Sequence, residues 1–359
     1  MKKALLIPIY EPNDKVVPFL KNFKHDDFDY FLVVNDGSNH SFDKIYQEIQ
    51  EQTVFEVIGY ETNQGKGHAL KYGMDYLINK GELDLIVTAD GDGQHAYKDI
   101  LNVKDNAINN PNCLVLGSRN FYQEGLPRNS RVGNKFSSKY FKMSTGKRVK
   151  DTQTGLRAIP SELFHLALTT NGERYDYEMN FLMDAVRNYP YKEVDIETIY
   201  ENQKNETSHF RPFVDSIKIY RTPLLYILIS LLSFGIDIGF FHLFSTQVFT
   251  ANSEQQVFLS TILARVISGV FNFLMFHFVV FQSRDDFAKK AFKYWILWTI
   301  NLGCSSGLTY LFKRLPAHLT FIKFIIDTFL AIVNYIINLS VIFVRKKIKK
   351  WNTNPFGLS

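Results

Sequence analysis

Cysteine is scarce in this chain, and the signatures of several common protein classes are missing. Only two cysteines occur among its 359 residues, Cys113 and Cys304, and neither lies in a CxxC pair. The sequence therefore implies neither a disulfide framework nor a thiolate zinc site. No Gly-x-x-x-x-Gly-Lys-Ser/Thr stretch is present, so P-loop hydrolysis of a nucleoside triphosphate is not supported. The first apolar run stops after about seven residues, which predicts a buried strand rather than a signal peptide.

Charge and hydrophobicity are unevenly distributed along the chain. Hydrophobic residues make up 46% of it, with 32 Phe and 19 Tyr, which excludes a disordered or fibrous protein. Residues 1–210 carry 25 Lys and Arg against 30 Asp and Glu, whereas residues 211–359 carry 16 against 6. In the second part, positive charge lies between and after long apolar runs. That pattern is typical of a membrane domain, so we expect a membrane and no nucleic acid as partner.

Short apolar runs alternate with helix-length segments in the first part of the chain. The runs cover residues 5–9, 31–34, 55–58, 83–87, 113–116 and 194–199. Strands separated by helices predict an α/β fold with a Rossmann-like, mainly parallel sheet. Ligands of such sheets bind beyond the carboxyl ends of the strands, so the polar residues that follow each run are the candidates for a site.

Four longer apolar segments follow, at about residues 223–249, 257–281, 291–312 and 319–344. Each is long enough to cross a bilayer, so they predict an all-α domain of four transmembrane helices over residues 223–346. Lys and Arg precede the first segment, surround the middle loop and follow the last segment. This places the domain of residues 1–209 and both termini in the cytoplasm, with Lys313 and Arg314 as a mild exception.

Two further segments complete the expected organisation. Residues 210–222 have apolar side chains at three- and four-residue spacing, which predicts an amphipathic helix at the cytoplasmic interface. A plain linker helix packed on the first domain is the alternative. Residues 347–359 form a basic cytoplasmic tail, most simply a topology anchor that also attracts anionic lipid.

A charged side chain within a membrane-spanning segment costs free energy, so its presence indicates a partner or a function. Counting along each segment places Asp237, Arg265 and Asp327 at similar depths in the outer half of the bilayer. We hypothesise that they form a buried cluster in which Arg265 pairs with one or both carboxylates. The two interpretations are a staple between helices and a path for a lipid headgroup.

Two carboxylates separated by one small residue directly follow the run at residues 83–87. Asp90 and Asp92 on such a turn can both reach one divalent cation, and Gln94 adds a neutral oxygen. Hard oxygen ligands with few charges suit Mg²⁺ or Mn²⁺ bridged to a diphosphate. An ordinary acidic turn is the alternative, but the position at a strand end and the glycines that permit close approach, Gly91 included, favour a site.

Other polar residues follow other strands at the same predicted edge. Asp36 or Glu11 can accept hydrogen bonds from a ribose or a base, and Tyr10 can lie along a base face. Pro8 belongs to the same stretch as Tyr10 and Glu11. Lys66 lies between two glycines at a predicted helix start, a suitable place for an anion. A turn or a helix cap would explain some of these residues equally well.

Taken in order, these motifs resemble family 2 glycosyltransferases. The stretches are Ile-Pro-Ile-Tyr-Glu-Pro, Val-Asn-Asp-Gly-Ser, Asn-Gln-Gly-Lys-Gly-His-Ala, Asp-Gly-Asp-Gly-Gln-His, Gly-Ser-Arg and Asp-Thr-Gln-Thr-Gly-Leu-Arg. The group most resembled is that of the polyprenyl-phosphate sugar synthases, which are dolichyl-phosphate-mannose synthase-like, and the resemblance covers about residues 3–210. The remainder is similar to the GtrA-like membrane domain, on its layout and on Asp237, Arg265 and Asn272.

The resemblance implies a GT-A fold and an inverting hexosyltransferase. It implies nucleotide-sugar binding by Pro8, Tyr10, Glu11, Asp36, Lys66, Asp90, Gly91 and Asp92, and a metal, Mg²⁺ or Mn²⁺, on Asp90, Asp92 and Gln94. Arg119 and Arg131 would bind the acceptor phosphate, which makes the implied catalytic set Asp90, Asp92, Arg119 and Arg131. Because a phosphomonoester is already largely dianionic at neutral pH, no general base is required, and His95 is expected to support the site. A structural role is the alternative for Asp151 and Arg157.

The expected activity is transfer of a hexose from UDP-glucose or UDP-N-acetylglucosamine to undecaprenyl phosphate. The product would be a lipid-linked monosaccharide for cell-envelope glycosylation. GDP-mannose is the alternative donor, and transport of the product by the membrane domain is an alternative of another class. Four helices are few for a transporter unless the protein is a homo-oligomer. A processive polysaccharide synthase is disfavoured because no Gln-x-x-Arg-Trp motif is present.

Overall fold

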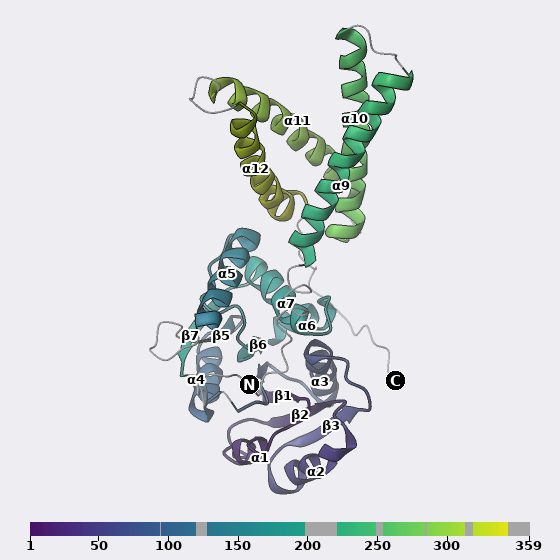
Figure 1. The fold of residues 1–359 in the computed structure, drawn as a ribbon. Coiled ribbons are helices and arrows are strands. Elements are labelled where there is room, and N and C mark those ends of the chain that lie inside the picture. The colour runs from purple at the N-terminus through teal and green to yellow at the C-terminus, as the bar shows by residue number, and fades with distance from the viewer. Residues whose placement is uncertain are drawn as a thin grey trace. The chain divides into compact units, whose positions relative to one another are not determined.

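The computed structural model describes residues 1–93, 95–119, 128–197, 221–248, 254–283, 286–312 and 319–343. The chain divides near residue 220 into two compact units (Figure 1).

The first unit is built on one sheet, which has seven strands among the described residues in the order β3-β2-β1-β4-β6-β5-β7. Neighbouring strands are parallel except at β6, which runs antiparallel to β4 and β5. The strands are β1 Lys3–Ile9, β2 Tyr30–Asp36, β3 Glu56–Tyr60, β4 Leu85–Thr88, β5 Leu114–Arg119, β6 Arg157–Pro160 and β7 Tyr191–Ile196. The predicted mainly parallel α/β sheet is confirmed.

Helices cover both faces of this sheet and bury two apolar cores. Side chains alternate along β1, so Leu6 contributes to one core and Leu5 and Ile7 to the other. The first core includes α3 Lys66–Lys80, α5 Arg128–Thr145, α6 Phe164–Thr169 and α7 Tyr175–Asn188, and the second includes α1 Val16–Leu20, α2 Asp43–Gln52 and α4 Tyr97–Ile108. Short 3₁₀ turns lie at His40–Phe42 and Ser161–Leu163.

The strand predictions differ from the structure by a few residues at most strand ends, and one strand was not predicted. Phe55 and Cys113 lie just before their strands, and β7 begins at Tyr191, three residues earlier than expected. The sequence did not predict β6, because its four residues begin with Arg157 and end with Pro160 and form no apolar run. Between β4 and β5, however, even four residues find hydrogen-bonding partners on both sides.

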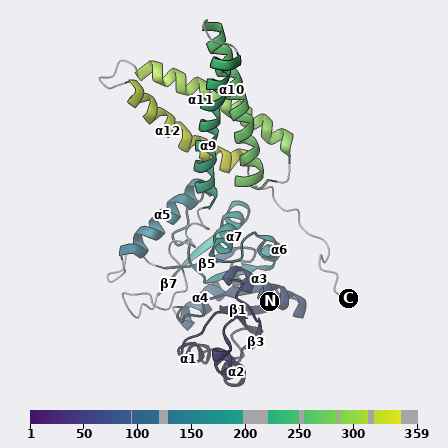
Figure 2. The same ribbon diagram turned by 45° about the vertical axis from the view of Figure 1, so that its right-hand side comes forward.

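The second unit contains four helices among the described residues. They are α9 Arg221–Leu243, α10 Glu254–Met275, α11 Phe287–Phe312 and α12 Leu319–Ile337, and π-helical turns extend three of them at Phe244–Val248, Phe276–Val280 and Asn338–Ile342. In both Figures 1 and 2, α9 runs beside α10 and α11 beside α12. Within the described residues, Arg221–Val248 and Leu259–Val280 are long and apolar enough to cross a membrane. Four transmembrane helices remain a prediction.

The domain boundaries also remain predictions. The expected interfacial helix at residues 210–222 lies outside the described residues up to residue 220, and Arg221 already begins α9. The basic tail at 347–359 lies outside them entirely.

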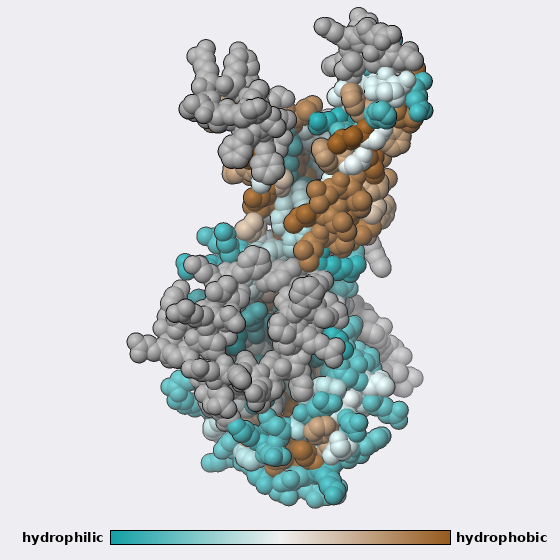
Figure 3. Space-filling view, in the orientation of Figure 1, coloured by the Kyte–Doolittle hydropathy of each residue, from teal (hydrophilic) through white to brown (hydrophobic). Residues whose placement is uncertain are grey.

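The surface of α9 is strongly apolar. Figure 3 shows hydrophobic side chains gathered along it, whereas the described surface of the first unit in that view is mostly hydrophilic. Leu231 and Phe234 are both more than 60% exposed. Water would penalise such a face, and lipid would not, which supports membrane contact for this helix.

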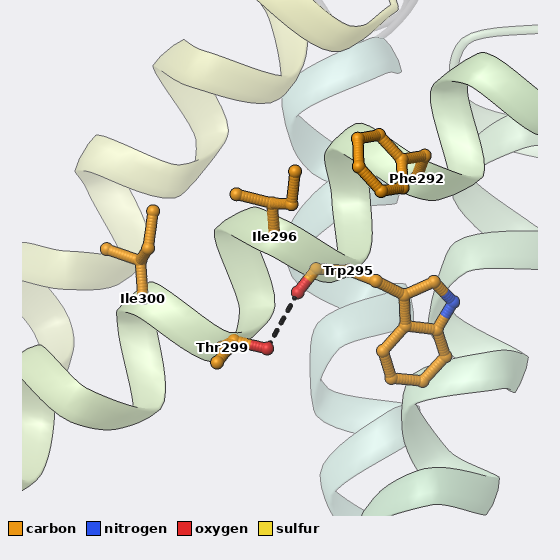
Figure 4. A pocket seen from close by; sticks show the side chains of 5 residues that line it. All are labelled: Phe292, Trp295, Ile296, Thr299 and Ile300. Atoms are coloured by element: carbon orange, nitrogen blue, oxygen red, sulfur yellow. Dashed lines mark hydrogen bonds between the residues drawn. The ribbon is translucent and has the colours of Figure 1, made fainter.

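A shallow depression of about 350 Å³ lies along α11. Figure 4 shows that its lining side chains come from that helix alone, and they are Phe292, Trp295, Ile296, Thr299 and Ile300. The Thr299 hydroxyl donates to the Trp295 carbonyl oxygen at 3.0 Å. The lining contains no charged side chain, so it offers nothing that would bind a nucleotide.

Candidate active site

The carboxyl ends of β1, β2 and β4 meet at one edge of the sheet, as the parallel order predicts. Asp36 is the last residue of β2, and β4 ends two residues before Asp90. Tyr10 and Glu11 follow directly on β1. The edge therefore brings together polar residues that are up to 80 positions apart in the sequence.

Asp90 lies at the centre of a network of charged side chains. Lys66 Nζ is 2.5 Å from its Oδ1, and His95 Nε2 is 3.2 Å from its Oδ2. Burial alone would raise the pKa of the Asp90 carboxyl, but the charge of Lys66 and the contact with His95 outweigh it and hold that pKa well below its usual range. Asp90 is therefore ionised at any working pH, and His95 contacts the carboxylate as a supporting residue would.

Lys66 has a second carboxylate partner. Its Nζ donates to Glu178 Oε1 in α7 at 2.9 Å. Burial would lower the pKa of Lys66, but the charges of Asp90 and Glu178 outweigh it and raise the pKa above its usual range. Lys66 is held as a cation at the start of α3, where the sequence predicted an anion-binding residue.

The Asp-Thr-Gln-Thr-Gly-Leu-Arg stretch, which leads into β6, supports this network. The Thr88 hydroxyl donates to the Gly155 carbonyl oxygen at 2.9 Å. A Cβ at Gly155 would lie 2.2 Å from Asp90 Oδ1, so only glycine allows the backbone this close to the carboxylate.

Asp151 in the same stretch binds the side chain of Arg119 through two hydrogen bonds. Arg119 Nε lies 2.6 Å and Nη2 3.1 Å from the two oxygens of the fully buried Asp151 carboxylate. The side chain of Arg119 is 20% exposed, so Asp151 fixes the guanidinium while part of it reaches the surface. Binding of the acceptor phosphate by Arg119 stays a prediction, and Asp151 has a structural role here.

Arg157 completes this support. It is buried, with Nε donating to the Thr154 carbonyl oxygen at 3.0 Å and Nη1 to the Glu178 carbonyl oxygen at 2.9 Å. Arg157 thus ties β6 to the first turn of α7 and fixes the backbone at Glu178.

The Asp36 carboxylate is buried, and it accepts hydrogen bonds from groups of the chain itself. Asp36 is 3% exposed, and its carboxylate accepts from the Tyr60 hydroxyl at 2.6 Å, Asn63 Nδ2 at 3.0 Å and the backbone N–H groups of Gln64 and Gly65 at 3.1 Å each. Asp36 therefore holds the loop that leads into α3 and to Lys66. A nucleoside contact remains a prediction.

The β1 end is held in an unusual conformation. Glu11 has a φ of 49°, and its N–H donates to the Ser38 hydroxyl at 2.8 Å. Such a left-handed residue is strained unless its neighbours fix it, which is common in binding sites. Tyr10 is half-buried. Pro8 is buried inside β1, and its contact with the nucleotide-sugar stays a prediction.

Gly91 is also constrained by β1. A Cβ there would lie 2.6 Å from Ile9 Cγ1 and 3.1 Å from the Pro8 carbonyl oxygen. The Ile9 side chain occupies the space that an alanine would need, which is a physical reason for glycine between Asp90 and Asp92.

A metal ion fits this edge only with further ligands. No group of three or more His, Cys, Asp or Glu residues that could hold one occurs in the described parts of the chain. Asp90 and Asp92 still supply hard oxygen atoms, and Mg²⁺ or Mn²⁺ is commonly completed by water and substrate phosphates. The residues therefore fit a cation whose remaining ligands are water molecules or the oxygens of a diphosphate. Gln94, the third predicted ligand, and the side chain of Arg131, within α5, lie outside the described residues.

Charged residues in the second unit form a simpler arrangement. Arg265 Nε lies 3.6 Å from Asp237 Oδ2, and the Ser268 hydroxyl donates to Asp237 Oδ1 at 3.1 Å. The pair joins α9 to α10. The side chain of Asp327, in α12, lies outside the described residues, so its place in the cluster remains a prediction.

The comparisons with known proteins point to one family. The model of glycosyl transferase family 2 matches residues 5–167. A UDP-N-acetylglucosamine–dolichyl-phosphate N-acetylglucosaminyltransferase of Methanococcus voltae is 31% identical over 214 residues, which are 55% of this chain and 85% of that protein. The chain belongs to glycosyltransferase family 2. An uncharacterised protein of Methanocaldococcus jannaschii is 29% identical over 202 residues, 55% of this chain and 81% of its own.

Solved structures are also similar to this family 2 chain. Glucosyl-3-phosphoglycerate synthase from Mycobacterium tuberculosis, solved with Mn²⁺, UDP and glucosyl-3-phosphoglycerate, matches with a TM-score of 0.42 and 14% identity over 63% of this chain and 78% of its own. S. aureus TarS 1–349 in complex with UDP-GlcNAc matches with a TM-score of 0.36 and 14% identity over 94% and 90%.

Two site residues were not found from the sequence. Glu178 is 112 positions from Lys66, and no spacing rule connects a lysine at one helix start with a glutamate in another helix. Gly155 belongs to the Asp-Thr-Gln-Thr-Gly-Leu-Arg stretch, but nothing in the sequence indicates that its backbone lies against the Asp90 carboxylate.

Proposed function

We propose that this family 2 glycosyltransferase transfers a sugar from a nucleotide-sugar to the phosphate of a polyprenyl phosphate. The observation that carries the proposal is the likeness to the Methanococcus voltae enzyme, whose name gives a UDP-sugar donor and a dolichyl-phosphate acceptor. That name favours UDP-N-acetylglucosamine, ahead of UDP-glucose and GDP-mannose. Undecaprenyl phosphate is the proposed acceptor if the chain serves cell-envelope glycosylation.

The charges at the site suit such a transfer. An oxygen of the acceptor phosphate would form a bond to the anomeric carbon, and the bond from that carbon to the donor diphosphate would break, with the electron pair leaving on the nucleoside diphosphate. Because the acceptor is already ionised, no residue has to remove a proton. Arg119, held by Asp151, would bind the incoming phosphate, and Lys66 the diphosphate. A divalent cation on Asp90 and Asp92 would neutralise the leaving diphosphate.

The second unit would keep this site beside its lipid substrate. We propose a multi-pass, GtrA-like anchor in the cell membrane with the transferase unit in the cytoplasm. The two candidate spans and the apolar face of α9 support membrane contact. The ion pair between Asp237 and Arg265 would act as a staple between α9 and α10.

A donor screen tests the proposal. Purified full-length protein in detergent would receive undecaprenyl phosphate or dolichyl phosphate, Mg²⁺ or Mn²⁺, and one UDP- or GDP-sugar at a time. We expect one UDP-sugar to give a lipid-linked product. Asp92→Asn should abolish it, whereas Asp105→Asn, a change on the exposed face of α4, should not. Absence of a lipid product from every donor would overturn the proposal.

A further inference from the structure

One ammonium group bridges two carboxylates that come from different parts of the first unit. Lys66 Nζ lies 2.5 Å from Asp90 Oδ1 and 2.9 Å from Glu178 Oε1. The three side chains are 20%, 26% and 11% exposed, so water screens their charges only in part. Lys66 therefore couples the proposed metal ligand to a residue of α7.

The contact with Asp90 conflicts with the proposed function of that carboxylate. Lys66 lies against an Asp90 oxygen, and a divalent cation on the same carboxylate would repel the ammonium group. Lysine has a flexible stem, so its ammonium can move by a few ångströms while the backbone stays in place. The start of α3 is fixed by the bonds from Gln64 and Gly65 to Asp36.

Glu178 is suited to retain Lys66 after such a move. Its backbone is fixed because its carbonyl oxygen accepts from the buried Arg157 guanidinium, and its carboxylate remains 11% exposed. A negative charge that stays in place lowers the cost of moving a cation away from Asp90.

We propose that Glu178 is a positioning residue that holds Lys66 when a divalent cation displaces it from Asp90, so that the ammonium can then contact the diphosphate of the donor. Lys66 thus exchanges one anion for another and keeps Glu178 throughout. The inference rests on the proposed function for the identity of the donor, but not for the exchange at Asp90.

The test measures Mn²⁺ affinity of the full-length protein in detergent by electron paramagnetic resonance, without nucleotide. Glu178→Gln leaves Asp90 as the one carboxylate partner of Lys66 among the described residues, so Mn²⁺ affinity should fall by about tenfold, the size of other effects transmitted to a metal through a neighbouring residue. Lys66→Met frees Asp90, so Mn²⁺ affinity should rise while UDP affinity falls.

The double variant distinguishes the exchange from simple attraction between Glu178 and the cation. In the Lys66→Met background, Glu178→Gln should change Mn²⁺ affinity less than about twofold, because Glu178 then has no lysine to hold. An equal loss in both backgrounds would overturn the proposal, and so would an unchanged affinity in Glu178→Gln alone.

Two further variants control for folding. Glu173→Gln removes a carboxylate that pairs with Lys71 and His68 on the same helix, and it should leave Mn²⁺ affinity unchanged. Glu178→Asp keeps the charge and should recover most of the affinity lost in Glu178→Gln; failure to recover any would contradict the charge-based role. Intact Mn²⁺ coupling with no sugar transfer would reject the proposed function alone.

Discussion

The aspartates of the two units differ in how many separate elements contact them. In the first unit, Asp36, Asp90 and Asp151 each receive two or more partners from separate strands, loops or helices. In the second unit, Asp237 has Arg265 and Ser268, which lie three residues apart on the same neighbouring helix. A charge fixed from several directions has a defined position, as chemistry requires, whereas a charge fixed from one helix mainly links two helices.

Removal of the Asp90 carboxylate should have the largest effect on the first unit. Asp90→Asn takes away one of the two carboxylates proposed to bind the cation and leaves Glu178 as the carboxylate partner of Lys66 among the described residues. Loss of several kcal/mol of transition-state stabilisation corresponds to a fall in transfer of at least about a hundredfold. Initial rates with the donor found in the screen measure it. A variant that keeps wild-type rates would exclude Asp90 from catalysis.

Substitution of Asp151 and of Asp237 by asparagine tests how far each unit depends on an ion pair for its stability. Asp151→Asn leaves Arg119 without a buried counter-charge, and breaking such a pair costs about 3–5 kcal/mol. Asp237→Asn keeps an acceptor for Ser268, and polar contacts between membrane helices are worth about 0.6 kcal/mol on average. Thermal unfolding of both variants in one detergent gives the comparison. Equal losses would show that the second unit depends on its charge pair as strongly as the first.

Glycine substitutions provide a smaller contrast. A Cβ at Gly155 would overlap Asp90 Oδ1, so Gly155→Ala should cost about 1–3 kcal/mol through overpacking and should also weaken Mn²⁺ binding. Gly235 lies in α9, and no described atom would be within 4 Å of a Cβ there. Gly235→Ala should therefore be neutral or slightly stabilising. Tm and Mn²⁺ affinity are the measurements, and a neutral Gly155→Ala would mean that the loop at Gly155 can retreat.

The sequence predicted those features that depend on neighbouring residues. Apolar runs located six of the strands to within a few residues, because buried strands need continuous apolar side chains. The lengths of the apolar segments likewise matched α9 to α12 closely, since helix length follows the apolar stretch. Asp36 and Asp90 were predicted to lie at one edge because they stand at the carboxyl ends of strands in a parallel sheet, and their binding functions stay predictions.

Features that depend on distant residues were not predictable in the same way. The antiparallel β6 is too short to have a pattern of its own, and its place is decided by β4 and β5. The pairing of Lys66 with Glu178 requires α3 and α7 to lie side by side. Three of the four hydrogen-bond donors to the Asp36 carboxylate come from residues 63–65, and the conformation of that loop does not follow from the sequence.

The reversed direction of β6 has a consequence for any attempt to lengthen or shorten this protein. Because β6 runs against its neighbours, the residues before it, and not those after it, arrive at the site, with Arg157 opposite Thr88. The residues that reach the site therefore precede β6 in the sequence, whereas for the parallel strands they follow the strand. An insertion after Pro160 would lie at the end of β6 that faces away from the site, whereas one added residue between Asp151 and Arg157 would move Gly155 off the Asp90 carboxylate.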